Sequence, residues 1–100
     1  MTRQLLILPA ARIEISAAQD WYEEASLGLG GAFRLEVDRQ LQRVAANPGH
    51  FAVVHRTVRC ARLRRFPYGL FFRAELSAIQ VIACFHASRD PLAWQSRTQR

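Results

Sequence analysis

The feature that most constrains the fold is a change in the spacing of the apolar residues near Phe51. Before Phe51, apolar residues recur at steps of about four, as in Ile13, Ala17, Trp21 and Ala25 and again in Phe33, Val37, Leu41 and Val44. After Phe51, the segment 58–66 alternates between small or apolar residues and arginines. Steps of three to four indicate amphipathic helices, and alternation indicates strands. The sequence therefore predicts two helices followed by strands.

Glycine and proline set the boundaries of the predicted helices. A short first strand over residues 3–8 stops at Pro9, and the first helix starts at Ala10. The glycine cluster at 27–31 follows a helix and is not followed by a Lys-Ser/Thr pair, which favours a helix–helix turn over a phosphate-binding loop. Asn-Pro-Gly at 47–49 ends the second helix. The helix aromatics are assigned to the core: Trp21, Tyr22 and Phe33.

The second half of the chain is predicted to form strands over 58–66, 70–76 and 81–87, followed by a polar tail. Pro-Tyr-Gly at 67–69 is typical of a turn. The expected fold class is α+β with the order β-α-α-β-β-β, in which a helical hairpin packs on one face of a small antiparallel sheet. Residues 1–100 are long enough for a single domain.

The positive charge is concentrated in the second half. Residues 1–50 have a balance of −1 and residues 51–100 a balance of +7, and all fourteen basic residues are arginine. Helices on one side of a sheet leave the other face open. Alternation in 58–66 places Arg62 and Arg64 on one face with Cys60, and Arg59 and Arg65 on the other with Ala61 and Leu63. Such a surface indicates an anionic partner, or a solvated basic face.

The sequence argues against a membrane segment, a metal and a cofactor. The longest apolar run near the start is Leu5 to Leu8, far shorter than a bilayer span or a signal peptide. Cys60 and Cys84 show no metal-binding spacing, and the three histidines do not supply the missing ligands. We expect a soluble, cytoplasmic protein with buried free thiols.

Several short motifs resemble a known family. "DWYEEASLGLGGAF", a helix ending in "NPGHF", "RRFPYGLFFR" and "VIACFHASRDPLAW" occur in this order between about Ala10 and Arg97. Together they resemble the RelE/ParE toxin superfamily, and within it the ParE-like, plasmid-stabilisation branch. The β-α-α-β-β-β order predicted from the residues agrees with the fold of that family.

The resemblance implies a toxin of a bacterial type II toxin–antitoxin pair. Its partner would be a cognate acidic antitoxin of the ParD type, with a ribbon-helix-helix domain expected, in a hetero-oligomer. For the ParE-like branch the implied target is DNA gyrase. An arginine-rich surface suits an acidic tail that folds on binding.

Two other functions remain open. The RelE-like branch cleaves mRNA in the ribosome, and relatives of that kind use lysines and a tyrosine near the C-terminus. This chain has no lysine, its last tyrosine is Tyr68, and Trp94 stands where the tail tyrosine is expected. A conceivable acid–base set is His86 with Tyr68 or Glu75, although a structural histidine is the more common case. The third hypothesis is a nucleic-acid-binding module without toxin activity.

If the protein inhibits gyrase, a set of cationic and aromatic side chains is expected to contact target or antitoxin: Arg62, Arg64, Arg73, Arg89, Trp94 and Arg97. Trp94 could serve as an aromatic anchor or fold back to cap the core. Arg89 could instead form a local ion pair with Asp90.

Overall fold

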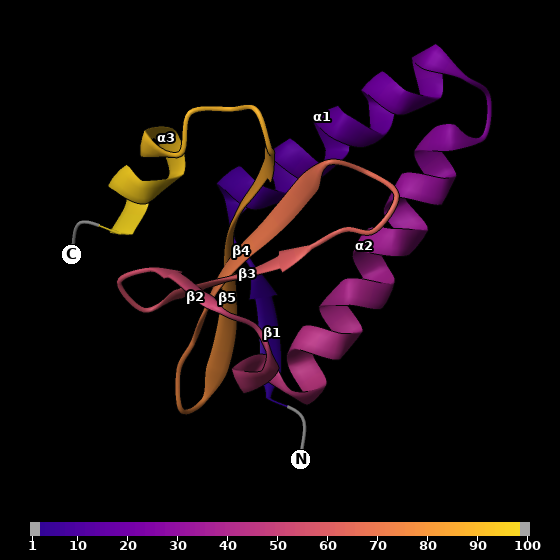
Figure 1. Ribbon diagram of the computed structural model, residues 1–100. Helices are drawn as coiled ribbons and strands as arrows, with labels where there is room; N and C mark the ends of the chain where they lie inside the picture. Colours follow the sequence, from indigo (N-terminus) through magenta and orange to yellow (C-terminus); the bar gives the residue numbers. More distant parts are fainter. Residues whose placement is uncertain (1–2, 99–100) are drawn as a thin grey trace.

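The computed structural model describes residues 3–98, which form one sheet, a long helical hairpin and a short C-terminal helix (Figure 1). The elements are β1 (Gln4–Ile7), α1 (Pro9–Ala25), α2 (Leu29–Ala46), β2 (Val53–His55), β3 (Val58–Arg62), β4 (Tyr68–Ala74), β5 (Ala78–His86) and α3 (Leu92–Gln95). Short 3-10 turns follow α2 at Pro48–His50 and α3 at Ser96–Thr98. The predicted α+β class and the helical hairpin are confirmed.

The strands lie in the order β1-β5-β4-β3-β2. Three neighbouring pairs are antiparallel, but β1 runs parallel to β5, pairing Gln4 with Ala78 and Ile7 with Val81. The prediction of an antiparallel sheet was therefore wrong at this edge. The short strand β2 and helix α3 were also missed, because segments of three and four residues are too short to show a periodic pattern.

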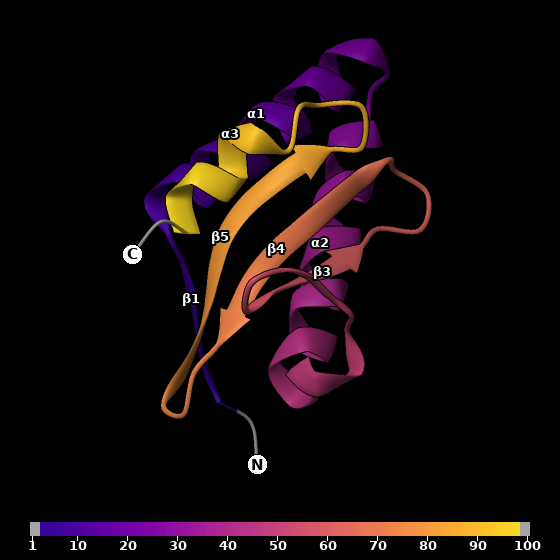
Figure 2. The ribbon, with the colours of Figure 1, turned by 60° about the vertical axis from the view of Figure 1, so that its left-hand side comes forward.

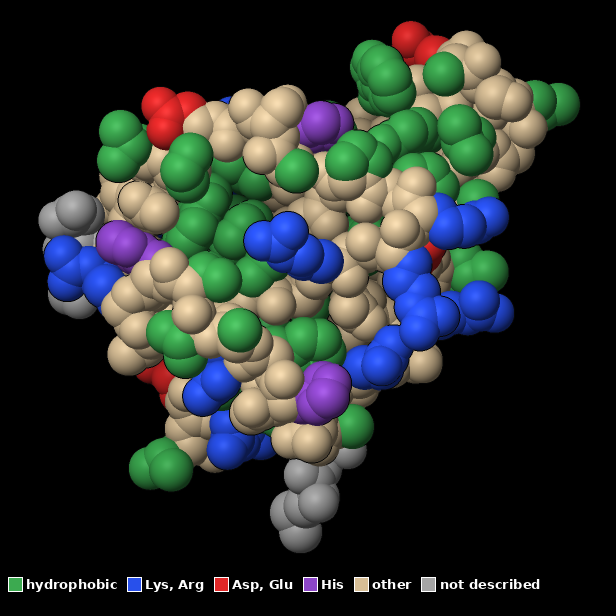
Figure 3. All heavy atoms as spheres, viewed as in Figure 1, with side chains coloured by type: hydrophobic (Ala, Val, Ile, Leu, Met, Phe, Trp, Pro, Cys, Tyr) green, Lys and Arg blue, Asp and Glu red, His purple; other side chains and the backbone are tan. Residues whose placement is uncertain are grey.

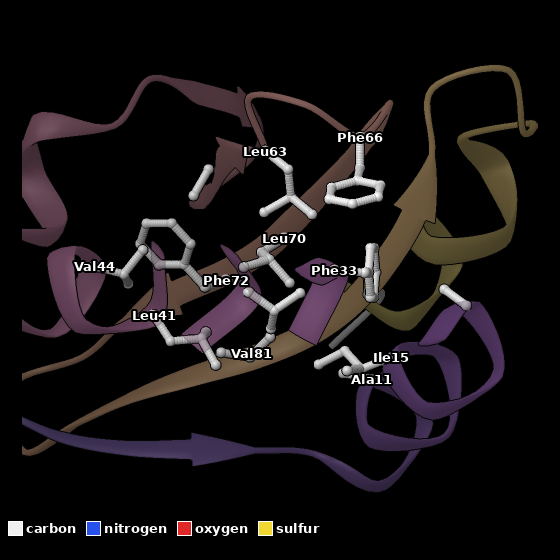
Figure 4. Close-up of a cluster of buried hydrophobic side chains, with 14 of the residues drawn as sticks. Ala11, Ile15, Phe33, Leu41, Val44, Leu63, Phe66, Leu70, Phe72 and Val81 are labelled. Atoms are coloured by element: carbon white, nitrogen blue, oxygen red, sulfur yellow. The ribbon is translucent and has the colours of Figure 1, made fainter. Parts of the chain in front are cut away.

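The helices α1 and α2 lie together on one face of the sheet (Figures 1 and 2). The predicted inner face of α2 is confirmed, since Phe33, Val37, Leu41 and Val44 are all buried. Figure 4 shows this core, where α2 side chains meet Leu70 and Phe72 of β4 and Val81 of β5.

The predicted inner face of α1 is wrong. Ile13 and Trp21 are 69% and 63% exposed, and the side chains that enter the core are those of Ala11, Ile15, Ala18 and Tyr22. Both sets have helical spacing, so α1 is apolar on two faces. The packing partner, rather than the period, decides which face is buried.

Close backbone contact explains the glycines between the helices. Gly28 has a φ of 88°, in the left-handed region that favours glycine. A Cβ on Gly30 would lie 2.6 Å from the carbonyl oxygen of Gln19, so only glycine fits there. The Glu23 carboxylate accepts the backbone N–H groups of Gly28 and Gly30, each at 2.9 Å. The predicted helix–helix turn is confirmed.

The second face of the sheet carries a smaller apolar cluster under α3. Trp94 packs there with Val58, Phe71, Ile82 and Phe85, so this face is partly covered. Within residues 3–98, no helix has the length and apolar character needed to cross a bilayer. Over the same range, no three His, Cys, Asp or Glu side chains gather as metal ligands.

Candidate functional site

An open groove of about 540 Å³ lies on the second face of the sheet, between the 63–67 segment and α3. Arg62, Arg64 and Arg89 line it, together with Tyr68 and His86. We call it the sheet-face groove. Figure 3 shows this face of the molecule, where apolar side chains gather in the middle and basic side chains lie beside them. With Trp94, which also lines the groove, six of the residues singled out from the sequence as site candidates therefore meet in one place, although they come from three separate segments.

The loop that carries the arginines is fastened to α2. Gln40 Nε2 donates to the backbone carbonyl of Arg62 at 2.9 Å. The Glu36 carboxylate accepts the backbone N–H groups of Arg64 and, at 3.1 Å, of Arg65. These bonds occupy the loop backbone, and the side chains of Arg62 and Arg64 remain exposed at the groove.

Glycine is required at the centre of the groove floor. Gly69 of β4 pairs with Arg62 on one side and Phe85 on the other. A Cβ at this position would lie 2.8 Å from the Cys60 sulfur and 3.5 Å from the Phe71 ring. A larger residue would therefore displace the side chains that shape the floor.

Arg89 reaches the groove from the segment after β5. Its guanidinium carbon lies 4.0 Å from the centre of the Phe85 ring, a cation–π geometry. Its ion-pair partner is Glu14 of α1, at 4.0 Å, rather than Asp90. The Asp90 carboxylate instead accepts the backbone N–H of Leu92, at the start of α3.

Trp94 is a packing residue in this structure. It is 3% exposed and its ring stacks on Phe71 with centroids 4.2 Å apart. Of the two alternatives drawn from the sequence, the structure shows the capping role. Trp94 forms a wall of the sheet-face groove and fixes α3 against the sheet.

Arg97 lies outside the lining of the groove, and its guanidinium makes hydrogen bonds within the fold. Its guanidinium donates to both oxygens of Glu14, at 2.7 and 3.2 Å, and to the carbonyl of Ile82 at 2.8 Å. Glu14 also accepts the N–H of Cys84 at 3.0 Å. Strand β1 pairs with β5 only up to Val81. Beyond that point, the side chains of Glu14 and Arg97 bond the Cys84 N–H and the Ile82 carbonyl on the edge of β5.

Arg73 and Glu75 also lie away from the groove lining. Arg73 donates to the side chain of Gln80, its partner on the neighbouring strand β5, at 2.9 Å. Glu75 begins the turn between β4 and β5, where its N–H donates to the Ala78 carbonyl at 2.8 Å. The structure thus separates Glu75 from the suggested acid–base set, and Arg73 from the arginines of the groove. Arg97 is also outside the lining, but it shares the Glu14 carboxylate and the Phe85 ring with Arg89.

His86 and Tyr68 are neighbours, with ring centroids 5.2 Å apart. The backbone N–H of Ser88 donates to His86 Nδ1 at 3.0 Å. In a neutral ring, the lone pair on Nδ1 is therefore engaged by this hydrogen bond, and the proton is on Nε2. Burial raises the pKa of Tyr68 above its ordinary value, and the nearby Tyr22 and Cys84 add to this, while Arg89 opposes it. Tyr68 therefore stays protonated at neutral pH and can donate a hydrogen bond.

Sequence reasoning missed several residues that build the site. Gly69 and Phe85 form its floor, Glu36 anchors its loop, and Glu14 holds Arg89 and Arg97. The alternating pattern placed Arg62 and Arg64 on the same side, but nothing local indicates that a glutamate 28 residues before Arg64 would bind the loop.

Comparison with known proteins identifies the fold. No protein-family model matches the sequence, and no curated protein matches it. Among solved structures, the chain is similar to one described as the chromosomal ParDE toxin–antitoxin system from P. aeruginosa, with a TM-score of 0.70 and 20% sequence identity. The match covers 85% of this chain and 96% of the other. The fold is therefore ParE-like, as the sequence motifs led us to expect.

Proposed function

We propose that this protein is the toxin of a bacterial type II toxin–antitoxin pair, that it inhibits DNA gyrase, and that a ParD-like antitoxin neutralises it in the cytoplasm. The observation that carries the proposal is the fold, shared over 85% of the chain with a protein of a ParDE system. The arginine-lined groove on the open sheet face supplies a surface for target and antitoxin.

The chemistry of the sheet-face groove supports binding to an acidic partner protein. Its walls combine the cations Arg62, Arg64 and Arg89 with aromatic surface from the half-buried Phe71 and Tyr68. An acidic tail that folds on binding needs both charge complementarity and apolar surface to cover. The partner would be a ParD-like antitoxin with a ribbon-helix-helix domain, and the complex a hetero-oligomer.

A second candidate function is ribosome-dependent cleavage of mRNA, which the closeness of Tyr68 and His86 in the same groove favours. This reaction needs a group that accepts the 2′-hydroxyl proton and another that protonates the leaving oxygen. The His86 lone pair is engaged by Ser88, Tyr68 stays protonated, and the chain has no lysine. We therefore rank cleavage below gyrase inhibition.

Two assays on the purified protein, each with and without the candidate antitoxin, separate these functions. One follows gyrase supercoiling and cleavage-complex formation, and the other follows mRNA cleavage during translation in vitro. We expect inhibition of gyrase, reversed by antitoxin, and intact mRNA. Ribosome-dependent cleavage with unaffected gyrase would overturn the proposal and assign proton transfer to His86 or Tyr68.

Single substitutions test the groove itself. We expect Arg62→Ala, Arg64→Ala and Arg89→Ala each to reduce gyrase inhibition by about tenfold or more, the loss of one charge-assisted hydrogen bond. The matched control is Arg12→Ala, which removes an exposed arginine from α1. Thermal unfolding checks that all four variants are folded. Full inhibition by all three groove variants would exclude this surface as the docking site.

A further inference from the structure

A second groove, of about 720 Å³, runs between α2 and the loop that follows β3. Five arginines line it, and we call them the arginine strip: Arg39 and Arg43 from α2, Arg62 from the end of β3, and Arg64 and Arg65 from the loop. All five are exposed. Figure 3 shows basic side chains in a row along the side of the molecule on which α2 lies. Because Arg62 and Arg64 line both grooves, the strip continues the sheet-face groove around the molecule.

The positive charge of the strip is poorly neutralised. Glu36 is the acidic residue in the lining, and its oxygens already accept the backbone N–H groups of Arg64 and Arg65. Its contact with the Arg65 guanidinium is long, at 3.6 Å. Within residues 3–98, the side chains of Arg39, Arg43, Arg62 and Arg64 form no ion pair.

The rest of the lining distinguishes between possible anionic partners. Among the described residues that line the strip none is aromatic, and the apolar contribution is limited to Ala32, Leu35 and the buried Leu63. A folded peptide tail needs apolar pockets, and single-stranded nucleic acid needs aromatic platforms for its bases. Arginine and glutamine side chains on an open polar surface suit the phosphate oxygens of a duplex backbone.

We propose that the arginine strip binds the phosphate backbone of double-stranded DNA without reading its sequence. The choice of DNA over RNA rests on the proposed function, since a protein that inhibits gyrase works beside the duplex that gyrase holds. The strip gives such an inhibitor a contact to the DNA. Arg39, Arg43 and Arg65 belong to the strip alone, whereas Arg62 and Arg64 are shared with the sheet-face groove.

The experiment measures binding of the full chain to a short labelled DNA duplex by fluorescence anisotropy over a series of salt concentrations. Five phosphate contacts predict a slope of about −4.5 for log K against log salt. In the double variant Arg39→Gln/Arg43→Gln, we expect the slope of log K against log salt to fall in magnitude by about 2, and binding to be weaker at every salt concentration. These two arginines lie outside the lining of the sheet-face groove. The matched control, Arg3→Gln/Arg12→Gln, removes the same charge from other exposed positions and keeps the native slope.

Three results would overturn the proposal. They are an equal change of slope in the control variant, tighter binding to an RNA duplex of the same sequence, and strip-dependent binding of an oligoglutamate peptide without strip-dependent binding of DNA. The assay contains neither gyrase nor ribosome, so its outcome is independent of the gyrase assay. DNA binding without gyrase inhibition would refute the proposed target while retaining the strip.

Discussion

The two tryptophans of the chain occupy opposite environments. Trp94 is stacked on Phe71 and in contact with the His55 ring, whose centroid lies 5.7 Å away. Trp21 projects from α1 into solvent, with an edge contact to Tyr22. Hydrophobic stabilisation follows the area removed from water. Trp94, in the short helix α3, therefore contributes more to stability than Trp21, in the long helix α1.

We expect Trp94→Ala to lower the free energy of unfolding by about 3 to 5 kcal/mol, because it leaves a cavity between α3 and the sheet. Trp21→Ala removes the same side chain from an exposed site and is expected to cost less than about 0.5 kcal/mol. Chemical denaturation followed by far-UV circular dichroism measures both. Similar losses in the two variants would contradict the assignment of Trp94 to the second core cluster.

At the scale of elements, Glu14 links three parts of the fold. Its carboxylate, 14% exposed, joins α1 to the backbone of β5 and to Arg97 in the C-terminal segment. Replacing the carboxylate by an amide removes the charge and one of the two oxygens that accept from the Cys84 N–H and the Arg97 guanidinium, and it sets an NH2 donor in place of that oxygen. Partly buried charge-assisted bonds of this kind are costly to break.

Glu14→Gln is expected to lower the free energy of unfolding by about 2 kcal/mol, since the pair is partly solvated. In an Arg97→Gln background the same substitution costs less, because its main partner is already absent. Asp38→Asn breaks the exposed pair with Arg34 and is expected to change stability by less than about 0.5 kcal/mol. Additive effects of the Glu14 and Arg97 substitutions would show that the pair is not coupled.

The turn between α1 and α2 depends on the charge of Glu23. The N–H of Gly28 lowers the pKa of this carboxyl below its ordinary value of 4.5, and Gly30 and Gly31 add to the effect. A carboxyl with a lower pKa in the folded state stabilises the fold above its unfolded pKa, and this contribution disappears as the pH falls through the folded value.

We therefore expect Glu23→Gln to be less stable than the native chain at neutral pH, and the difference to shrink below about pH 4. Denaturation curves recorded across this range give the difference directly. Glu24→Gln is the control, because that neighbouring side chain makes no hydrogen bond within residues 3–98. A difference that stays constant with pH would rule out the carboxylate as its cause.

At the scale of the whole molecule, one sheet separates two apolar clusters. The larger lies under α1 and α2, and the smaller lies under α3. Cys84, in the larger cluster, is 2% exposed, and burial raises the pKa of its thiol to about 12, with the Glu14 charge adding to the shift. Its thiolate is thus scarce until the molecule unfolds.

In a Cys60→Ala variant, we expect Cys84 to resist a thiol-specific reagent near pH 8 under native conditions. Its labelling should begin at the denaturant concentration where circular dichroism reports unfolding, because both cores are lost together in a two-state domain. The control is the same reaction on the fully unfolded variant, which should be fast. Labelling well before the transition would indicate that β5 opens separately.

The sequence by itself determined the features that depend on neighbours along the chain. The period of α2 placed Phe33, Val37, Leu41 and Val44 in the core, and the glycines at 27–31 separated the helices. Alternation put Arg62 on the sheet face away from the hairpin, but the strand predicted over 58–66 ends at Arg62, so Arg64 lines the groove from the loop. Helical and strand spacing are local properties of the backbone, so the order of the longer elements and the α+β class could be read directly.

Only the tertiary structure decided which of two apolar faces of α1 is buried, that β1 runs parallel to β5, and that Trp94 caps the sheet. It also joined Glu14 to Arg97, 83 residues later, and brought Arg39 and Arg43 beside the arginines of the β3–β4 loop. These features are contacts between distant segments. Their energies depend on which surfaces meet in space, and no spacing along the chain encodes that.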